Sequence, residues 1–170
     1  PGHGLRPAGT AQLVRGWIAL FPYVQDFVTV EVHELQAGQT AELAGFRVET
    51  LAMRHFQIPS LSYKFDGALV ICGDSDPLPE LKAFADGCKV MVHECSYTDE
   101  QANDGHANPT DLGRVLAGAK LDELLLTHFY PEAAEQGERV AAAVRRHFKG
   151  TVRLAQDFLT LEVPSPNGKR

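Results

Sequence analysis

Several apolar runs of this 170-residue chain end in a histidine or a carboxylate. The run "ALVIC" leads to Asp74, "VMV" is followed by His93 and Glu94, and "ELLLT" is followed by His128. Runs of this kind are strand candidates, and open α/β sheets bind their ligands at the carboxyl ends of the strands. The side chains at these ends are therefore the candidates for chemistry.

Two more histidines occupy comparable positions. His55 closes the segment "FRVETLAMRH", and His106 lies in the turn-rich loop "NDGHANP". Each signal is weak alone, because an Asp after a strand often caps a helix or a turn, and a His at a strand end is more often a satisfied polar residue than a ligand. Together, imidazole and carboxylate groups at neighbouring strand ends suit zinc, iron or manganese. The pattern therefore favours a transition-metal site.

The composition limits the other functions open to the chain. A net charge of −6 argues against a surface that binds nucleic acid by charge alone. No run approaches the ~20 apolar residues of a membrane span, and no signal peptide is recognisable. Cys72, Cys88 and Cys95 are odd in number and lack a C-x-x-C spacing, which favours reduced, buried thiols. We expect a cytoplasmic protein without membrane contact, for which nucleic acid is not the expected partner.

Alternating helices and strands would position these groups. Residues 1–163 are expected to form one domain, and 164–170 a flexible tail. The expected helices span 10–21, 78–87, 108–120 and 132–148, and the expected strands span 26–35, 46–53, 61–72 (a hairpin turning at Asp66-Gly67), 88–94, 123–129 and 151–163, the last as one or two strands. This order predicts an α/β chain with one mixed sheet and helices on one face.

The motifs also resemble a known family. The series "RHFQIPSLSYKF", "GDSDP", "VHECS", "GHANP" and "LTHF" is similar to the second half of the metallo-β-lactamase-fold hydrolases, and most similar to their ribonuclease Z and arylsulfatase-like branch. The closing "AQDFLTLEV" and the opening "PGHGLRPAGTAQLVRG" also resemble stretches of that branch. The resemblance covers nearly the whole chain.

The resemblance implies roles for individual residues. His55, Asp74 and His128 match family metal ligands, with Asp74 matching the carboxylate that bridges two metals. His106 matches the histidine that gives a proton to the leaving group, and Glu94 would orient a nearby histidine. The family ligand motif His-x-His-x-Asp-His is absent from this sequence.

The implied fold is half of an αββα sandwich, and this has a physical consequence. One sheet with a single helix layer would expose its inner apolar face, which soluble monomers rarely tolerate. We therefore expect a homodimer in which a second copy covers that face. A separate chain carrying the other half is the alternative.

The metal set and the reaction follow from the same implication. His55, Asp74 and His128 could hold one zinc ion per chain, with iron or manganese as alternatives, and a second ion would need further ligands such as His3 or His106. The expected function is hydrolysis of small phosphate esters, either phosphodiesters or phosphotriesters, by metal-activated hydroxide. The alternatives are a truncated, non-catalytic fragment that needs a partner chain, a lactone or sulfate-ester hydrolase, and an iron-bound oxidoreductase.

Overall fold

The computed structural model describes residues 2–6, 9–101 and 103–163. The expected tail at 164–170 lies outside these residues, so its flexibility stays a prediction. Within the described part, every helix is too short or too polar to cross a membrane.

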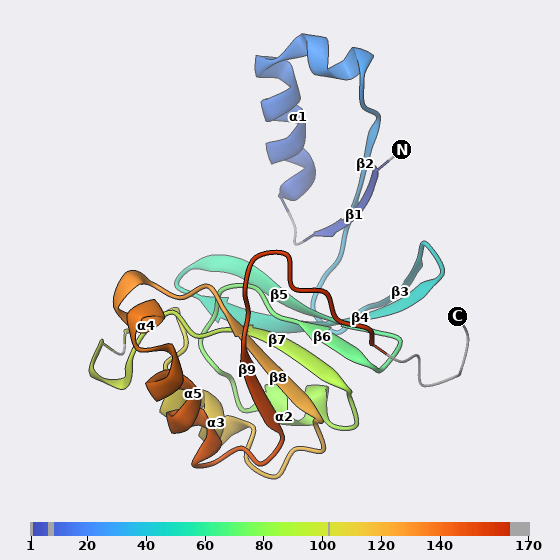
Figure 1. Cartoon of the computed structure of the whole chain (residues 1–170). Coiled ribbons are helices and arrows are strands. Elements are labelled where there is room, and N and C mark those ends of the chain that lie inside the picture. The colour runs from blue at the N-terminus through green and yellow to red at the C-terminus, as the bar shows by residue number, and fades with distance from the viewer. Residues whose placement is uncertain (1, 7–8, 102, 164–170) are drawn as a thin grey trace.

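A seven-stranded mixed sheet forms the body of the molecule, in the order β3-β4-β5-β6-β7-β8-β9 (Figure 1). The strands from β3 to β6 pair antiparallel, and those from β6 to β9 pair parallel. The hairpin expected at Asp66-Gly67 joins β5 to β6, and both turn residues have positive φ, as tight hairpin turns require. The strands are β3 (Thr40–Leu43), β4 (Phe46–His55), β5 (Ile58–Phe65), β6 (Leu69–Ile71), β7 (Val90–Glu94), β8 (Glu123–Thr127) and β9 (Thr151–Leu154).

Four helices cover one face of this sheet (Figure 1). They are α2 (Glu80–Ala85), α3 (Pro109–Val115), α4 (Pro131–Glu135) and α5 (Gly137–Arg145). The core lies between them and the sheet, where Met91 and Leu124 pack with Leu112 and Val144. The α/β class, the mixed sheet and the single helix layer agree with the sequence-based prediction.

The opposite face of the sheet is less bare than we expected. Ile71 is 40% exposed there, but Leu125 is only 7% exposed. The segment after β9, residues 155–163, turns back over the sheet on the side away from the helices (Figure 1). Of the one or two strands expected within 151–163, the structure has one, β9, which ends at Leu154 because its parallel partner β8 ends at Thr127 and offers no further backbone partners.

The described residues 2–6 and 9–34 contain a separate two-stranded sheet and one α-helix. β1 (Gly2–Arg6) pairs parallel with β2 (Val30–Glu34), and α1 (Thr10–Leu20) and the 3-10 helix η1 (Pro22–Asp26) connect them. Thr10 is the first residue of α1, and Gly9 takes the N-cap position with φ +93°. No residue of α1 is buried, so its outer side chains face solvent.

Local backbone geometry explains one further difference. The helix expected at 132–148 is divided at Gln136, whose backbone leaves the helical region. Gly137 then begins α5 so close to β9 that an added Cβ would lie 2.7 Å from Leu154 Cδ1. The divided helix therefore sits tightly against the last strand.

Close packing of α3 on α5 gives a prediction about stability. A Cβ at Gly113 would lie 2.7 Å from the Val144 carbonyl oxygen, and backbone cannot move aside cheaply. Gly113→Ala is therefore expected to lower the free energy of unfolding by about 1–3 kcal/mol in urea titrations. Gly16→Ala, in α1 with open space around the glycine, is the control and should not lower it. Equal stability of the two variants would contradict the packing argument.

Candidate metal centre

Four polar side chains meet at the carboxyl edge of the parallel strands. His128 directly follows β8, Asp74 follows β6, and His106 lies in the loop before α3. His55 ends β4. Because β4 is antiparallel to β5 and β5 is antiparallel to β6, β4 runs in the same direction as β6 and its carboxyl end lies at the same edge. The strand order therefore brings together residues that are up to 73 positions apart (128 minus 55).

The distances among these groups are short. Ligand atoms of His55, Asp74 and His106 all lie within 4.8 Å of one another, and His128 Nε2 lies 3.6 Å from Asp74 Oδ2. The predicted ligand set was His55, Asp74 and His128. The structure brings His55 and His128 each close to Asp74. It adds His106, for which we predicted proton transfer, to the same cluster.

Glu94 lies buried beside the cluster and holds His106 through a hydrogen bond. It is 1% exposed, and its Oε1 accepts from His106 Nδ1 at 2.8 Å and from the Ser75 backbone N–H at 2.9 Å. Its Oε2 accepts from the Ser96 backbone N–H at 3.0 Å and from the Ser96 hydroxyl at 2.7 Å. Four hydrogen bonds fill the acceptor positions of an ionised carboxylate. Glu94 thus lies where a residue that orients His106 would have to lie.

Ser96 orients His128 through a hydrogen bond with its Nδ1, as Glu94 orients His106. The sequence pattern did not predict this role of Ser96. Its hydroxyl lies 2.7 Å from Glu94 Oε2, 2.9 Å from the His128 carbonyl oxygen and 2.8 Å from His128 Nδ1. Both oxygens can only accept, and the carboxylate is the stronger acceptor, so the one hydroxyl proton points to Glu94 and the hydroxyl accepts from His128 Nδ1–H. The Nε2 lone pair of His128 is then free on the side of Asp74. Fixing a ligand histidine through its second nitrogen is typical of metal sites.

A second group fixes the His106 loop and was also missed. Asp76 Oδ1 accepts from the Gly105 backbone N–H at 3.0 Å, and its Oδ2 accepts from Arg54 Nε at 2.6 Å. The hydrogen bond and charge of Asp76 raise the pKa of the Arg54 guanidinium. The motif "GDSDP" therefore supplies a site carboxylate at Asp74 and a loop anchor at Asp76.

His93 and the cysteines lie outside the cluster. His93 is fully buried, and its Nδ1 donates to the Glu94 carbonyl oxygen. Burial lowers its pKa, which keeps it neutral. All three cysteines are free and buried, as expected, and burial raises the pKa of Cys72 to about 12. Thiolate ligands are therefore not available here.

The donor set fits a divalent transition metal. Three imidazoles and a carboxylate are ligands that zinc, iron and manganese accept. Ligands at zinc lie about 3.3 Å from one another in a tetrahedron of ~2.0 Å bonds, so the 3.6 Å between Asp74 and His128 is already near that spacing. The half-exposed Asp74 and His128 leave a side open to solvent, where a water or a substrate could enter.

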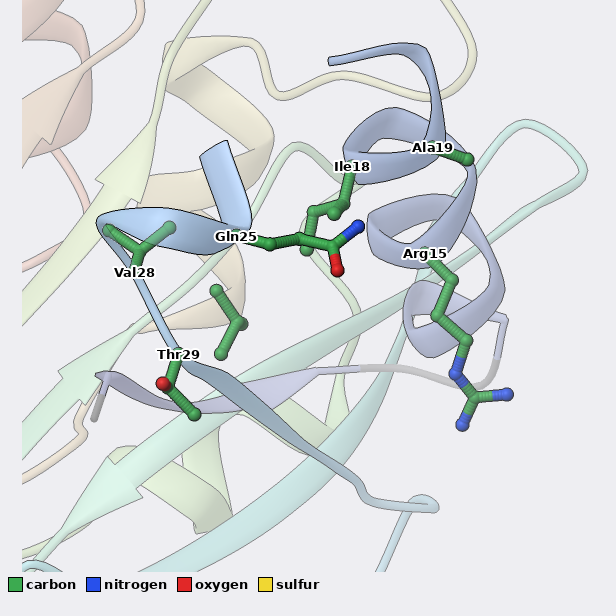
Figure 2. Close-up of a pocket in the computed structure, with 7 residues that line it drawn as sticks. Arg15, Ile18, Ala19, Gln25, Val28 and Thr29 are labelled. Carbon is green, nitrogen blue, oxygen red and sulfur yellow. The ribbon is translucent and has the colours of Figure 1, made fainter. Parts of the chain in front are cut away.

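A groove elsewhere in the molecule lacks such chemistry. It has a volume of about 440 Å³ and lies between α1 and the segment 25–30, lined by Arg15, Ile18, Ala19, Gln25, Val28, Thr29 and Val30. Figure 2 shows the amide of Gln25 turned toward α1, while the Arg15 guanidinium extends along the helix away from Ile18. Its lining holds no histidine or carboxylate, so it offers no second catalytic centre.

Comparison with known proteins gives a consistent assignment. A family model described as "beta-lactamase superfamily domain" matches residues 4–129. Ribonuclease Z of Halalkalibacterium halodurans is 29% identical over 140 residues, which cover 79% of this chain and 43% of that protein. The chain therefore spans less than half the length of that relative.

Two solved structures share the fold. A diphosphatase of the PhnP family superposes with a TM-score of 0.66 at 17% identity, over 95% of this chain and 59% of that one. Zinc-bound PqqB from Methylobacterium extorquens superposes with a TM-score of 0.65 at 17% identity, over 95% of this chain and 62% of that one. Sequence identities of 17% support a shared fold only.

Proposed function

Because the chain belongs to the metallo-β-lactamase superfamily, we propose that it acts as a metal-dependent hydrolase of small phosphate esters, with phosphodiesters as the first substrate class. The observation that carries this proposal is the cluster of Asp74 with three histidines at one sheet edge. A bound divalent cation would supply an activated water and positive charge beside the phosphoryl oxygens.

Residues of the chain would bind the cation and supply the proton for the leaving group. Asp74, His55 and His128 would hold the cation. Glu94 keeps the proton on His106 Nδ1 and can balance the charge of the doubly protonated ring. His106 can therefore give its Nε2 proton to the leaving oxygen, as a general acid should.

The names of the similar proteins support the choice of substrate and metal. Ribonuclease Z and the diphosphatase are named for phosphate chemistry, and PqqB was solved with zinc. Zinc is therefore the proposed metal, one ion per chain, and a phosphate ester the proposed substrate. Phosphotriesters, lactones and sulfate esters are less favoured because neither name points to them.

The second candidate function is a half-fold that gains activity only with a partner. The chain spans 43% of the ribonuclease Z it resembles, and its donor cluster is open to solvent on one side. In this case a partner chain would supply further ligands. The first candidate predicts that the isolated chain hydrolyses phosphate esters, and the second predicts that it does so only with a partner chain.

Metal content and turnover test the proposal. Purified protein loaded with zinc is expected to retain about one ion per chain after desalting, and to hydrolyse bis(4-nitrophenyl) phosphate. Chelation should remove turnover and re-addition should restore it. Stoichiometric metal without turnover would favour the half-fold, and protein that takes up no metal would contradict both candidates.

We also propose that a second copy of the chain covers the apolar surface. Exposed large apolar residues gather on the N-terminal unit, as Leu13, Trp17, Leu20, Phe21, Tyr23, Phe27, Val28 and Val30. A twofold contact needs only one self-complementary patch, which this surface supplies. The contact would thus centre on α1 and extend to the exposed Ile71 side of the sheet.

The solution mass tests this dimer. Light scattering is expected to give twice the 18.6 kDa of one chain. Trp17→Glu, which places a charge on the outer face of α1, should halve the mass. A wild-type monomer at micromolar concentration would refute the dimer.

A further inference from the structure

Phe56 stands in an unusual backbone conformation beside the donor cluster. It directly follows His55 and has φ +51°, a left-handed conformation that costs a bulky residue about 1–3 kcal/mol. Its side chain is 53% exposed. His55 pairs with Ile58, so Phe56 is the first residue of the two-residue turn between β4 and β5, and such turns require this positive φ. The turn therefore places a large, half-exposed apolar ring beside the donor cluster.

Contacts fix the position of this ring at the rim. Its centroid lies 5.0 Å from that of His55 and 5.6 Å from that of His106. A Cβ added at Gly105 would lie 2.8 Å from the ring carbons, so the glycine makes room for it. The ring therefore stands upright over the His106 loop.

A second aromatic ring stands near the same histidine. Tyr130 follows His128 by two residues and is 40% exposed. Its ring lies 5.7 Å from that of His106 and 5.9 Å from that of His128, and Tyr97 supports it at 5.1 Å. The rings of Phe56 and Tyr130 thus both lie within 6 Å of the ring of His106.

We propose that Phe56 and Tyr130 form an aromatic subsite that selects phosphate esters with a flat aromatic leaving group. This rests on the proposed function, because His106 is the group that would protonate the leaving oxygen. When the leaving oxygen of an ester lies within reach of His106, the group attached to that oxygen lies beside the rings of Phe56 and Tyr130. An aromatic group there can contact these rings.

The atoms of the step balance. Water adds to phosphorus and gives up one proton to solvent, and the bond between phosphorus and the leaving oxygen breaks. The aryloxide takes a proton from His106, which regains one from solvent. A ring contact of this kind is worth a factor of about 3 to 10, so the subsite is expected to change preference and to leave the chemistry itself unchanged.

Binding of two phosphonates separates the subsite from the phosphate site. We expect phenylphosphonate to bind the zinc-loaded protein about tenfold more tightly than methylphosphonate does in calorimetry. Phe56→Leu should remove most of that preference and leave methylphosphonate affinity unchanged. The control is Phe46→Leu, the same change at a 51% exposed phenylalanine at the other end of β4, which should keep the preference.

Kinetics give the second measurement. Phe56→Leu is expected to lower kcat/KM about tenfold for a 4-nitrophenyl ester and less than twofold for an alkyl ester. An unchanged phenyl preference in Phe56→Leu would overturn the subsite, and so would an equal loss with both phosphonates, since that would show a structural role only. Absence of turnover with every ester would count against the proposed function alone, and the phosphonate preference would still decide the subsite.

Discussion

The Asp74→Ala variant is expected to lose kcat/KM for a phosphodiester by about a thousandfold or more, and to lose its bound zinc on desalting. Asp74 is the carboxylate that lies among the histidines, 3.6 Å from His128 and within 4.8 Å of His55. Glu94 cannot replace it, because its oxygens already accept four hydrogen bonds. A thousandfold loss corresponds to about 4 kcal/mol of transition-state stabilisation.

The same substitution should leave the fold intact. Asp74 is 39% exposed, so its removal leaves no buried charge without a partner. Circular dichroism should show a wild-type spectrum. Asp122→Ala, which removes a 65% exposed carboxylate paired with Lys89, is the control and should retain both metal and turnover.

One result would contradict the role assigned to Asp74. A variant that keeps stoichiometric zinc and more than about a tenth of the turnover would show that the cation lies elsewhere. Asp74→Asn refines the test, because it keeps the shape of the side chain and removes its charge. It should lose nearly as much zinc as Asp74→Ala does.

The sequence was informative where the chemistry lies at the ends of parallel strands. Asp74 and His128 could be placed at one edge because β6, β7 and β8 are short apolar runs with little alternative to burial. His55 could be placed because the residues before it alternate as strand residues do. Adjacent parallel strands bring such ends together, whatever the length of chain between them.

Other features depend on contacts that a local pattern does not contain. Ser96 matters because its hydroxyl meets His128 across 32 residues, and Asp76 because it meets Gly105 across 29 residues. The strands β1 and β3 were missed because both are short and each pairs on one side only, where backbone pairing decides more than side-chain pattern. The covering of the second sheet face by 155–163 was missed for the same reason.

Glu94 is the residue whose loss should destabilise the protein most. Its carboxylate is 1% exposed and accepts hydrogen bonds from His106 Nδ1, the Ser96 hydroxyl and two backbone N–H groups. Glu94→Ala would leave these buried donors unsatisfied and open a cavity beneath His106. Removing one partner of such a buried polar group is expected to lower the free energy of unfolding by about 3–5 kcal/mol.

Glu94→Gln separates stability from function. Glutamine keeps the volume, but its amide nitrogen must face one pair of donors, so at least one hydrogen bond becomes a repulsion. We expect a smaller loss of stability, about 1–3 kcal/mol, together with a fall in kcat of about 10- to 100-fold as His106 loses its fixed orientation. Urea unfolding and steady-state kinetics measure the two effects separately.

An exposed glutamate provides the reference for both substitutions. Glu138 is 82% exposed and pairs with Arg145 at 3.4 Å, so Glu138→Ala should change the free energy of unfolding by less than about 0.5 kcal/mol. If Glu94→Ala were as stable as Glu138→Ala, the four hydrogen bonds of Glu94 would contribute nothing to the fold. If Glu94→Gln kept full kcat, the orientation of His106 would have to come from the rings of Phe56 and Tyr97 that pack against it.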